Sequence, residues 1–581
     1  MIKIRNQKKS NKQEFDSQSQ KKFTYLPLLF LLAIITGVFI LYWQTLSFDF
    51  TNLDDNIFIK KGDNEILSFN EIINSFLKGC FAEKDAYYRP LLMIYFKTMN
   101  HYFTDNLLET YHFVNILIHC LNILLLFYFL KSINQNRTTN LILVALFALH
   151  PTFTMAVAWI PGINDLLLTT FALLFFISTN KFIYKFNLLH ALIASLSFLF
   201  ALFIKETGIF LPLICFILVT KNFDFKPFLK PKVIAFLSVI LFEILLWYFL
   251  REGVLDKASK NVITQNWFTV LPHRLVSLFH YSSKALVPIN LCVYPVFEVG
   301  RITTDIFITL TFIVLLFGLL FKMKSKEGMY FTFVGLIWFG ILLTPILFMP
   351  AAAKPILFEH RLYLPFIGIL ICLLLPLNFL VDRLNSLTIG GFFLILIFYA
   401  FKVNAYVPYF SNSFEFCRNG AEFSPSSSRA QLNFGKALAE KNEMDSAIEY
   451  IKLSLKIDSK MHYSRYYLAL YKYIPNQKYD SALFFLHQEL NFTPEFPNNY
   501  LEISRCYLFK KDYPNSEHYL EKYRGLLPID DRIATIMIQL YIQNNHFKKA
   551  KSYSDSMLKK SVVIDTTLIK LINQGLSKNH Q

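Results

Sequence analysis

The sequence is poor in charged residues and has no clustered cysteines. Only 17% of its 581 residues are charged, whereas 54% are hydrophobic, and 62 are phenylalanine. Apolar runs of about 20 residues recur along the chain, which excludes an ordinary soluble protein of this size. The seven cysteines are scattered without a CxxC pair, so neither a disulfide framework nor a cysteine metal site is indicated. The composition predicts a polytopic membrane protein.

A cleavable secretion signal is also missing. The first apolar run, 23–46, follows a basic cytoplasmic leader at 1–22. This run is longer than the roughly 7–15 residues of a signal-peptide core, and no small-residue cleavage site follows it. Because basic segments stay on the cytoplasmic side of a membrane, we expect an uncleaved first span and a cytoplasmic N-terminus.

Ten more apolar runs predict an all-α membrane bundle of about eleven transmembrane helices within 23–410. The loops that this count assigns to the cytoplasm are net basic or neutral, as the positive-inside rule requires. These loops also account for the net charge of +17, so nucleic-acid binding is not indicated. The predicted spans are 23–46, 111–130, 140–158, 165–178, 188–204, 209–219, 233–250, 306–321, 330–349, 362–380 and 388–407.

Polar residues at the outer ends of these spans are expected to converge. The outer loop 48–110 carries the acidic pair Asp54 and Asp55, and apolar residues at helical spacing predict two short amphipathic helices in it. Ionisable groups in or near spans are costly and by default face a cavity. His119 and His150 are each eight residues from an outer end, about 12 Å deep, which predicts a shared polar cavity. The candidates for this cavity beyond the acidic pair are Arg89, His112, Asn115, His119, His150, Asp165, Lys205, Glu206, Glu359, His360, Arg361 and Tyr363.

Several of these candidates have structural alternatives. The acidic pair could cap the following loop helix. Neighbouring opposite charges could form ion pairs that close a turn, and three histidines could hold zinc, although no acidic residue at ligand spacing accompanies them. The ion pairs in question are Lys205 with Glu206 and Glu359 with Arg361, and the histidines are His112, His119 and His150.

Outward carboxylates, outward cations and a membrane cavity suit glycosyl transfer from a lipid-linked sugar phosphate. A carboxylate accepts the proton of the attacking hydroxyl, and cations stabilise the departing phosphate. Asp54 or Asp55 is the candidate base. No cofactor is assigned, although the loop acids could bind a divalent metal. The alternatives are a noncatalytic scaffold for envelope proteins and a transporter of the lipid-linked sugar. The candidate phosphate partners are Arg89, Lys205, His360 and Arg361.

After a linker at 411–427, the segment 428–581 is charged, rich in tyrosine and periodic. Ala447, Ala482, Ser516 and Ala550 are separated by 35, 34 and 34 residues, and Gly435, Leu470, Ser504 and Ile538 lie twelve positions before them. This spacing is that of tetratricopeptide repeats, which stack as helix pairs into a solenoid. About four repeats are predicted, with the extra residue in the turn 474–478. An unrelated helical bundle is the alternative.

Seven motifs occur in the order NLDD, YYRPL, HFVNILIH, ALHPTFTMAVAWIPGINDLL, IKETG, HYSSKALVPINLCVYP and EHRLYLP. With the repeats, this order resembles the transmembrane and tetratricopeptide repeat-containing O-mannosyltransferase family within the C-type glycosyltransferases. The resemblance implies the C-type glycosyltransferase fold, a polyprenol- or dolichol-phosphate sugar donor, commonly mannose, inversion at the anomeric carbon, and a protein acceptor presented by the repeats.

The resemblance also implies roles for single residues. It implies that Asp54 is the catalytic base and that Asp55 supports Asp54. It also matches Arg89 and Arg361 to basic motif positions near the donor. This chain departs from the family in its short repeat array and in an aromatic segment reduced to KGCF at 78–81. The repeats are expected outside the cytoplasm, on the periplasmic side of a bacterial inner membrane, or in the endoplasmic reticulum if the protein is eukaryotic.

Overall fold

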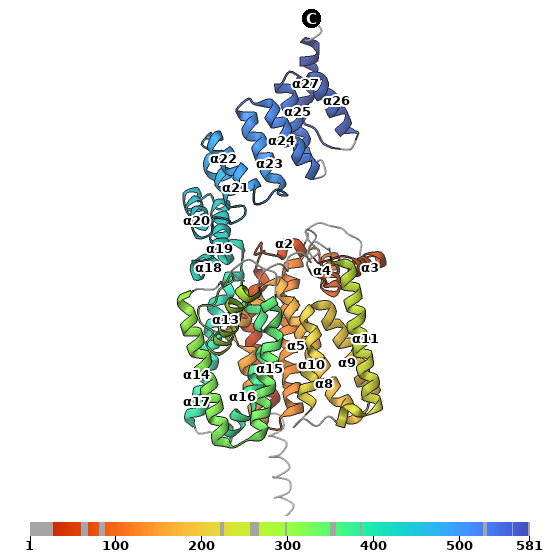
Figure 1. Cartoon of the computed structure of the whole chain (residues 1–581), viewed down its shortest axis with the longest axis vertical. Coiled ribbons are helices and arrows are strands. Elements are labelled where there is room, and N and C mark those ends of the chain that lie inside the picture. Colours follow the sequence, from red (N-terminus) through yellow and green to blue (C-terminus); the bar gives the residue numbers. More distant parts are fainter. Residues whose placement is uncertain are drawn as a thin grey trace, which may run out of the picture. The chain divides into compact units, whose positions relative to one another are not determined.

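The computed structural model describes residues 27–59, 68–80, 87–220, 226–255, 267–296, 299–348, 356–383, 386–526, 531–559 and 562–578. The basic leader lies outside these residues. Every regular element within them is a helix (Figure 1). The chain divides into two compact units, Met1–Ser424 and Pro425–Gln581. The segment expected as a linker contributes a helix, α18 (Ser413–Phe423), to the first unit.

The first unit contains helices suited to crossing a membrane. Among the described residues, seven helices are long and apolar enough, or eight if the bent pair Arg137–Ala148 and Pro151–Ala158 is one span. The bend of 46° falls at Pro151, which has no N–H to continue the helix. The remaining predicted spans correspond to helices of 10–17 residues, so eleven crossings are not confirmed.

The initial span (Pro27–Ser47) ends in η1, and the labelled helices of the first unit follow in chain order. They are η1 (Trp43–Ser47), α2 (Asp55–Phe58), α3 (Phe69–Leu77), α4 (Pro90–Tyr102), α5 (Leu107–Ile133), α6 (Arg137–Ala148), η2 (Pro151–Phe153), α7 (Thr154–Ala158), η3 (Ile160–Gly162), α8 (Ile163–Lys185), α9 (Leu188–Ile204), η4 (Glu206–Phe210), α10 (Leu211–Val219), η6 (Lys226–Leu229), α11 (Pro231–Val254), α13 (Trp267–Leu286), α14 (Val299–Met323), α15 (Lys326–Phe348), η8 (Glu359–Leu362), α16 (Phe366–Val381), α17 (Ser386–Tyr406), η9 (Val407–Phe410) and α18.

The two helices predicted in the first outer loop are confirmed as α3 and α4. Ser68 caps α3 by accepting a hydrogen bond from the Glu71 backbone N–H, and Pro90 opens α4 at a position where its missing N–H costs nothing. Lys97 Nζ lies 2.6 Å from a carboxylate oxygen of Glu71. This ion pair joins the two helices.

Close packing of α15 and α16 depends on two glycines. A Cβ at Gly335 would lie 2.3 Å from the Gly368 carbonyl oxygen, and a Cβ at Gly368 would lie 2.4 Å from the Gly335 carbonyl oxygen. Small residues let membrane helices approach to backbone contact. The crossing fixes α15, which lines the cavity described below through Leu342 and Pro345, against α16.

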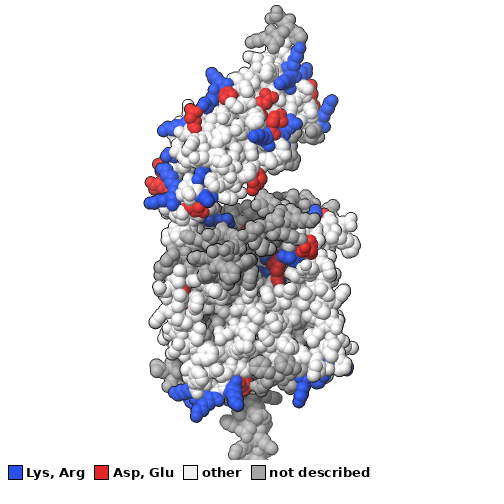
Figure 2. Space-filling view, viewed as in Figure 1, with Lys and Arg blue, Asp and Glu red and all other residues white. Residues whose placement is uncertain are grey.

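Basic side chains gather at one end of the first unit (Figure 2). In the sequence, basic residues lie in, or in the helix turns next to, the connections between α5 and α6, α8 and α9, α14 and α15, and α16 and α17. Because alternate connections of an up-and-down bundle emerge at the same end, this pattern agrees with the loop alternation seen in the sequence. The residues are Lys131, Arg137, Lys181, Lys185, Lys322, Lys324, Lys326 and Arg383.

The second unit consists of helix pairs. The predicted small positions lie where paired helices cross, and Ala447, Ala482, Ser516 and Ala550 are fully buried. In the third pair, Ser504 Oγ donates to the Ser516 carbonyl oxygen at 2.8 Å and Ser516 Oγ donates back to the Ser504 carbonyl oxygen at 2.9 Å. The pairs are α19 (Ser428–Glu440) with α20 (Met444–Ile457), α21 (Ser464–Leu468) and η10 (Ala469–Tyr473) with α22 (Tyr479–Leu490), α23 (Pro497–Phe509) with α24 (Tyr513–Leu526), and α25 (Asp531–Gln543) with α26 (Phe547–Leu558), followed by α27 (Thr566–Lys578).

All four turns between paired helices have the same geometry. Each has a residue with positive φ followed by a backbone N–H that bonds five residues back, and in the second repeat Lys478 N–H donates to the Tyr473 carbonyl oxygen at 2.9 Å. The extra residue is therefore not in the turn 474–478, as the sequence suggested. The π-helical turn at Ala469–Tyr473, where Ile474 N–H bonds to the Ala469 carbonyl oxygen, absorbs it inside the helix.

Replacing Gly435 with Ala should destabilise the repeat unit. A Cβ there would lie 2.8 Å from Ile451 Cγ1 and 3.0 Å from the Ala447 carbonyl oxygen, and overpacking of this kind costs about 1–3 kcal/mol. Gly525 in α24 is a matched control, because its Cβ would meet nothing within 4 Å. Gly525→Ala should gain up to about 1 kcal/mol of helix propensity. Urea unfolding of residues 425–581 measures both changes, and equal effects of the two substitutions would contradict the close crossing.

Candidate functional site

A cavity of about 400 Å³ in the first unit collects polar residues from distant parts of the chain. Its volume is within the range of about 300–1,000 Å³ that is typical of small-molecule sites. The loop before α2, the start of α4, the α7–α8 turn, the α9–η4 junction, α15 and η8 all contribute to its lining. The ionisable residues that line it are Asp54, Tyr87, Arg89, Asp165, Lys205, Glu206, His360 and Arg361.

Arg89 is held at the cavity by two side chains. Its Nε lies 3.2 Å from both carboxylate oxygens of Glu206, and its Nη2 lies 2.9 Å from Glu206 Oε2. Asn164, in the amide orientation that satisfies both of its polar atoms, accepts from Arg89 Nη1 at 3.0 Å and donates to the Ile204 carbonyl oxygen at 3.1 Å. Burial raises the pKa of Glu206, but the Arg89 guanidinium outweighs this effect, so the pKa is lowered overall. The two groups form a charged pair in one wall.

Lys205 forms a second pair, with Asp165. Its Nζ lies 2.7 and 2.9 Å from the two carboxylate oxygens, and His360 Nε2 lies 3.9 Å from Asp165 Oδ2. Burial lowers the pKa of His360 well below its usual value, and Lys205, Arg361 and Arg89 lower it further. His360 is therefore neutral at pH 7. The ion pair expected as an alternative, Lys205 with its neighbour Glu206, does not form, because each pairs with a residue far away in the sequence.

Arg361 differs from the other two cations of the cavity. Its Nη1 donates to the Ile356 carbonyl oxygen at 3.1 Å, and its guanidinium carbon lies 5.3 Å from the centre of the Phe358 ring. Among the described residues, no carboxylate lies within ion-pair distance of it. Its positive charge is thus less compensated than those of Arg89 and Lys205.

The two acids of the first outer loop have different surroundings. Asp54 lines the cavity, and although it occupies the N-cap position of α2, its side chain makes no capping hydrogen bond. Asp55 is buried. It accepts from Thr51 N–H at 2.6 Å and Thr51 Oγ1 at 2.8 Å through Oδ2, and from Trp159 Nε1 at 2.9 Å through Oδ1. Burial raises the pKa of Asp55 despite these bonds. Its contacts are with the protein, and it does not line the cavity.

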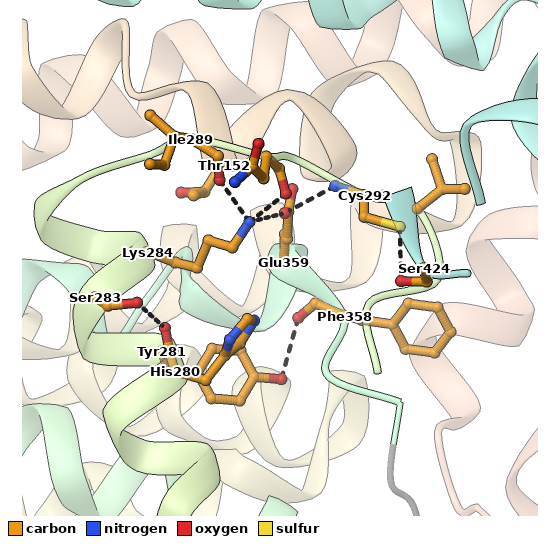
Figure 3. Close-up of polar contacts among 12 residues, drawn as sticks. Thr152, His280, Tyr281, Ser283, Lys284, Ile289, Cys292, Phe358, Glu359 and Ser424 are labelled. Carbon is orange, nitrogen blue, oxygen red and sulfur yellow. Dashed lines mark hydrogen bonds and ion pairs between the residues drawn. The ribbon is translucent and has the colours of Figure 1, made fainter. Parts of the chain in front are cut away.

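A buried ion pair fixes η8, the short helix that carries His360 and Arg361 (Figure 3). Lys284 of α13 lies 3.3 Å from Glu359 Oε1 and donates to the Ile289 carbonyl oxygen at 2.8 Å. Glu359 Oε1 also accepts from Cys292 N–H at 3.0 Å. Glu359 therefore pairs with Lys284 and not with Arg361. It does not line the cavity, but it fixes η8, which forms part of the cavity wall.

The structure corrects the expectation of one polar cavity for the remaining candidates. His119 bonds to the Tyr363 hydroxyl at 2.6 Å and to the Ala148 carbonyl oxygen at 3.1 Å, whereas His150 bonds to Thr152 Oγ1 and to the Ala285 carbonyl oxygen. Both ring nitrogens of each are used, so neither can ligate zinc without rearrangement. The side chains that are packed between helices and do not line the cavity are His112, Asn115, His119, His150, Glu359 and Tyr363.

Asn115 shows what such a buried side chain does. Its Nδ2 lies 3.2 Å from the Val157 and 3.1 Å from the Trp159 carbonyl oxygens, so it holds the turn that brings Trp159 to the cavity. His112 packs edge-on against Phe48, with ring centres 6.0 Å apart. Within the described ranges, no group of three or more His, Cys, Asp and Glu side chains is placed to hold a metal ion.

Sequence reasoning assigned no role to several residues that line the cavity or support its wall. Trp159 and Phe358 line the cavity, and Lys284 supports η8. The signal for Lys284 was available, because a lysine in the largely apolar motif HYSSKALVPINLCVYP needs a partner. Nothing comparable marks Phe358 among 62 phenylalanines.

The fold and the cavity define a multi-pass helical membrane protein with an attached helical-repeat domain. Compared with curated proteins, the chain is similar to "Protein O-mannosyl-transferase TMTC1" of Homo sapiens, with 39% identity over 111 residues, which cover 19% of this chain and 12% of the relative. It is also similar to "Protein O-mannosyl-transferase Tmtc1" of Drosophila melanogaster, with 29% identity over 181 residues, which cover 30% of this chain and 21% of the relative. The resemblance predicted from the seven motifs is thus confirmed.

The similarity covers only short parts of the curated relatives. The chain matches only 12% of the human relative and 21% of the fly relative, and no protein-family model matches it. Among solved structures, MamA 41-end from Desulfovibrio magneticus RS-1 is similar with a TM-score of 0.24 and 14% identity, over 25% of this chain and 82% of that structure.

Proposed function

We propose that the protein transfers a sugar from a polyprenol-phosphate donor to a hydroxyl of a protein acceptor. The observation that carries the proposal is a cavity lined by the carboxylate of Asp54 together with the guanidinium of Arg361. The similarity to proteins named O-mannosyl-transferases supports it and favours mannose as the sugar. The donor fits a site in a membrane protein because its prenyl tail stays in the bilayer.

The chemistry needs one base and one cation. Asp54 takes the proton from the acceptor hydroxyl as its oxygen bonds to the anomeric carbon, and the bond between that carbon and the phosphate oxygen breaks. The electron pair leaves with the polyprenyl phosphate, whose negative charge Arg361 stabilises. Attack from the face opposite the leaving group inverts the anomeric carbon. Arg89, Lys205 and His360 complete the phosphate side, with Arg89 and Lys205 oriented by their acidic partners.

The proposed orientation puts this cavity outside the cytoplasm. The basic connections gathered at one end of the first unit support a cytoplasmic position for that end. With eleven crossings and an N-terminus in the cytoplasm, the repeats are extracytoplasmic, where their helix pairs bind the protein acceptor. A bacterial inner membrane or the endoplasmic reticulum provides such a compartment.

Transfer of radiolabelled mannose from polyprenol phosphate to protein, in membranes that contain the full chain, tests this function. Wild-type membranes should label protein above membranes without the chain. Absence of transfer with several polyprenol-phosphate sugars and intact, folded protein would overturn the proposal and favour the scaffold.

Arg361→Ala should weaken use of the donor. A hydrogen bond to a charged group contributes about 1.5–3 kcal/mol, so we expect KM for the donor lipid to rise roughly tenfold or more. KM for the acceptor should stay within about twofold, because the acceptor does not contact this guanidinium. Arg383→Ala, at the opposite end of α16 where the arginine is exposed, is the matched control. Equal losses for donor and acceptor would instead show a structural role.

A further inference from the structure

Three aromatic rings line one part of the cavity. Trp159 comes from the α7–α8 turn, and Phe358 and His360 come from the start of η8. The ring centres are 6.4 Å apart for Trp159 and Phe358, 5.3 Å for Phe358 and His360, and 5.4 Å for Trp159 and His360. The interplanar angles are 24°, 25° and 40° in the same order.

These distances describe a wall of rings. Three rings stacked in a column would put the outer two about twice as far apart as neighbours, but here the three separations are nearly equal. The ring centres therefore form a triangle of similar sides. Phe358 is stacked with an offset against both Trp159 and His360, and the last two rings are tilted against each other, so the three form one continuous aromatic cluster in the lining of the cavity.

The groups around the wall are charged. Asp165 Oδ2 lies 3.9 Å from His360 Nε2, and the Arg361 guanidinium carbon lies 5.3 Å from the centre of the Phe358 ring. A ligand that suits this part of the cavity has an apolar face for the aromatic rings and hydroxyls at its edge for the Asp165 carboxylate. It also carries an anion, about one ring width away, for the Arg361 guanidinium. A pyranose has a face of C–H groups and hydroxyls at its edge, and in a sugar phosphate the anion is attached to the ring.

We propose that Trp159, Phe358 and His360 form the platform on which the sugar ring of the lipid-linked donor lies, with Asp55 as the residue that positions Trp159. The inference rests on the proposed function and adds to it the part of the cavity that distinguishes a sugar-bearing lipid from the bare lipid phosphate. The sugar packs its C–H face on the rings, its hydroxyls reach Asp165, and its phosphate reaches Arg361.

Asp55 positions the platform through the indole. Trp159 Nε1 donates to Asp55 Oδ1 at 2.9 Å and lies 3.1 Å from Thr51 Oγ1. Asp55 Oδ2 is held by Thr51 N–H and Oγ1. Since Asp54 is the next residue along the chain, one short loop holds both the proposed base and the proposed sugar platform.

Binding of two lipids to the purified full chain in lipid nanodiscs tests the platform. The probes are radiolabelled polyprenol-phosphate mannose and polyprenol phosphate without sugar, at equal chain length. Aromatic contacts contribute enough that Phe358→Leu and Trp159→Leu should each weaken binding of the mannosylated lipid by about three- to tenfold. Binding of the bare lipid phosphate should change by less than about twofold.

Three further variants give the controls. Phe358→Tyr keeps the ring and should keep the wild-type preference for the mannosylated lipid. Asp55→Asn replaces one of two accepting oxygens by an NH2 group, which faces a donor at either position, Trp159 Nε1 or Thr51 N–H. It should therefore loosen the Trp159 tether and reduce the preference in the same direction as the Trp159 variant, which a residue needed only for folding would not do selectively. Phe401→Leu, on the exposed side of α17, should leave both affinities unchanged.

The possible outcomes distinguish a failure of the proposed platform from a failure of the proposed function. Equal weakening for both lipids in the Leu variants would overturn the platform, because the rings would then contact the prenyl chain or the phosphate. Wild-type protein that binds neither lipid would overturn the donor assignment itself. Selective loss of mannosylated-lipid binding with intact phosphate binding supports the platform, even in a variant that no longer transfers sugar.

Discussion

Asp54→Asn is expected to lower the rate of sugar transfer by roughly 100- to 10,000-fold, the contribution of a general base. The amide cannot accept the proton of the acceptor hydroxyl, but it has the size and shape of the carboxylic acid. Binding of donor and acceptor should therefore change little, and the loss should appear in kcat. Transfer from radiolabelled polyprenol-phosphate mannose, measured at saturating donor, gives this number directly.

The two neighbouring acids of the chain provide its controls. Asp49→Asn alters an exposed acid of the same loop, whose carboxylate accepts from the Phe50 backbone N–H, and should leave transfer unchanged. Asp55→Asn should change the preference between lipids, as argued above, with a smaller effect on kcat than Asp54→Asn. Full activity of Asp54→Asn would exclude it as the base, and a larger loss in Asp55→Asn would exchange the two roles.

The repeats were well predicted from the sequence because their structure is local. Each crossing needs a small residue at a fixed interval, so Ala447 and its equivalents reveal the period directly. The predicted position of the extra residue was wrong, because an extra residue lengthens the repeat by one whether it lies in a π turn or in a longer loop. Only the repeated hydrogen bond of the turns, such as Lys478 N–H to the Tyr473 carbonyl oxygen, distinguishes them.

The charged residues of the cavity could be predicted because an ionisable side chain near a membrane is costly and by default faces a cavity. The partners of these residues could not be predicted. Lys205 and Glu206 are adjacent, and the sequence suggested that they pair. The chain is extended at Lys205, with φ −157° and ψ 137°, before η4 begins. Adjacent side chains of an extended backbone point apart. Each therefore reaches a residue from a different helix, Asp165 or Arg89.

The histidines show the limit of a depth argument. Counting residues from the end of a span gives the depth of a side chain but not the direction in which it points. His119 and His150 were expected to meet in one cavity on this basis. His119 turns to Tyr363 of the η8–α16 segment, and His150 turns to the Ala285 carbonyl oxygen of α13. The rotation of each helix about its axis depends on packing that the sequence pattern does not encode.

Removal of Lys284 should have the largest effect on stability in the first unit. In Lys284→Met, the Glu359 carboxylate stays buried without its cation, and breaking a buried pair in this way costs about 3–5 kcal/mol. Burial raises the pKa of Glu359 even in the wild type, where Lys284 opposes the rise. The loss of Lys284 raises that pKa further. The thermal unfolding temperature of the full chain in detergent should fall clearly.

The double variant Lys284→Met/Glu359→Gln tests the cause. It removes both charges but keeps a carbonyl oxygen for the Cys292 N–H, so it should regain most of the lost stability. The single variant should also depend on pH with a defined sign. Since the folded protein binds the Glu359 proton more tightly than the unfolded chain does, its stability falls as pH rises above about 4.3, the usual pKa of a glutamate. The deficit of Lys284→Met should therefore be smaller at pH 5 than at pH 8. A deficit that is independent of pH and remains in the double variant would show that Lys284 acts through its bonds to the Ile289 and Asn290 carbonyl oxygens and not through Glu359.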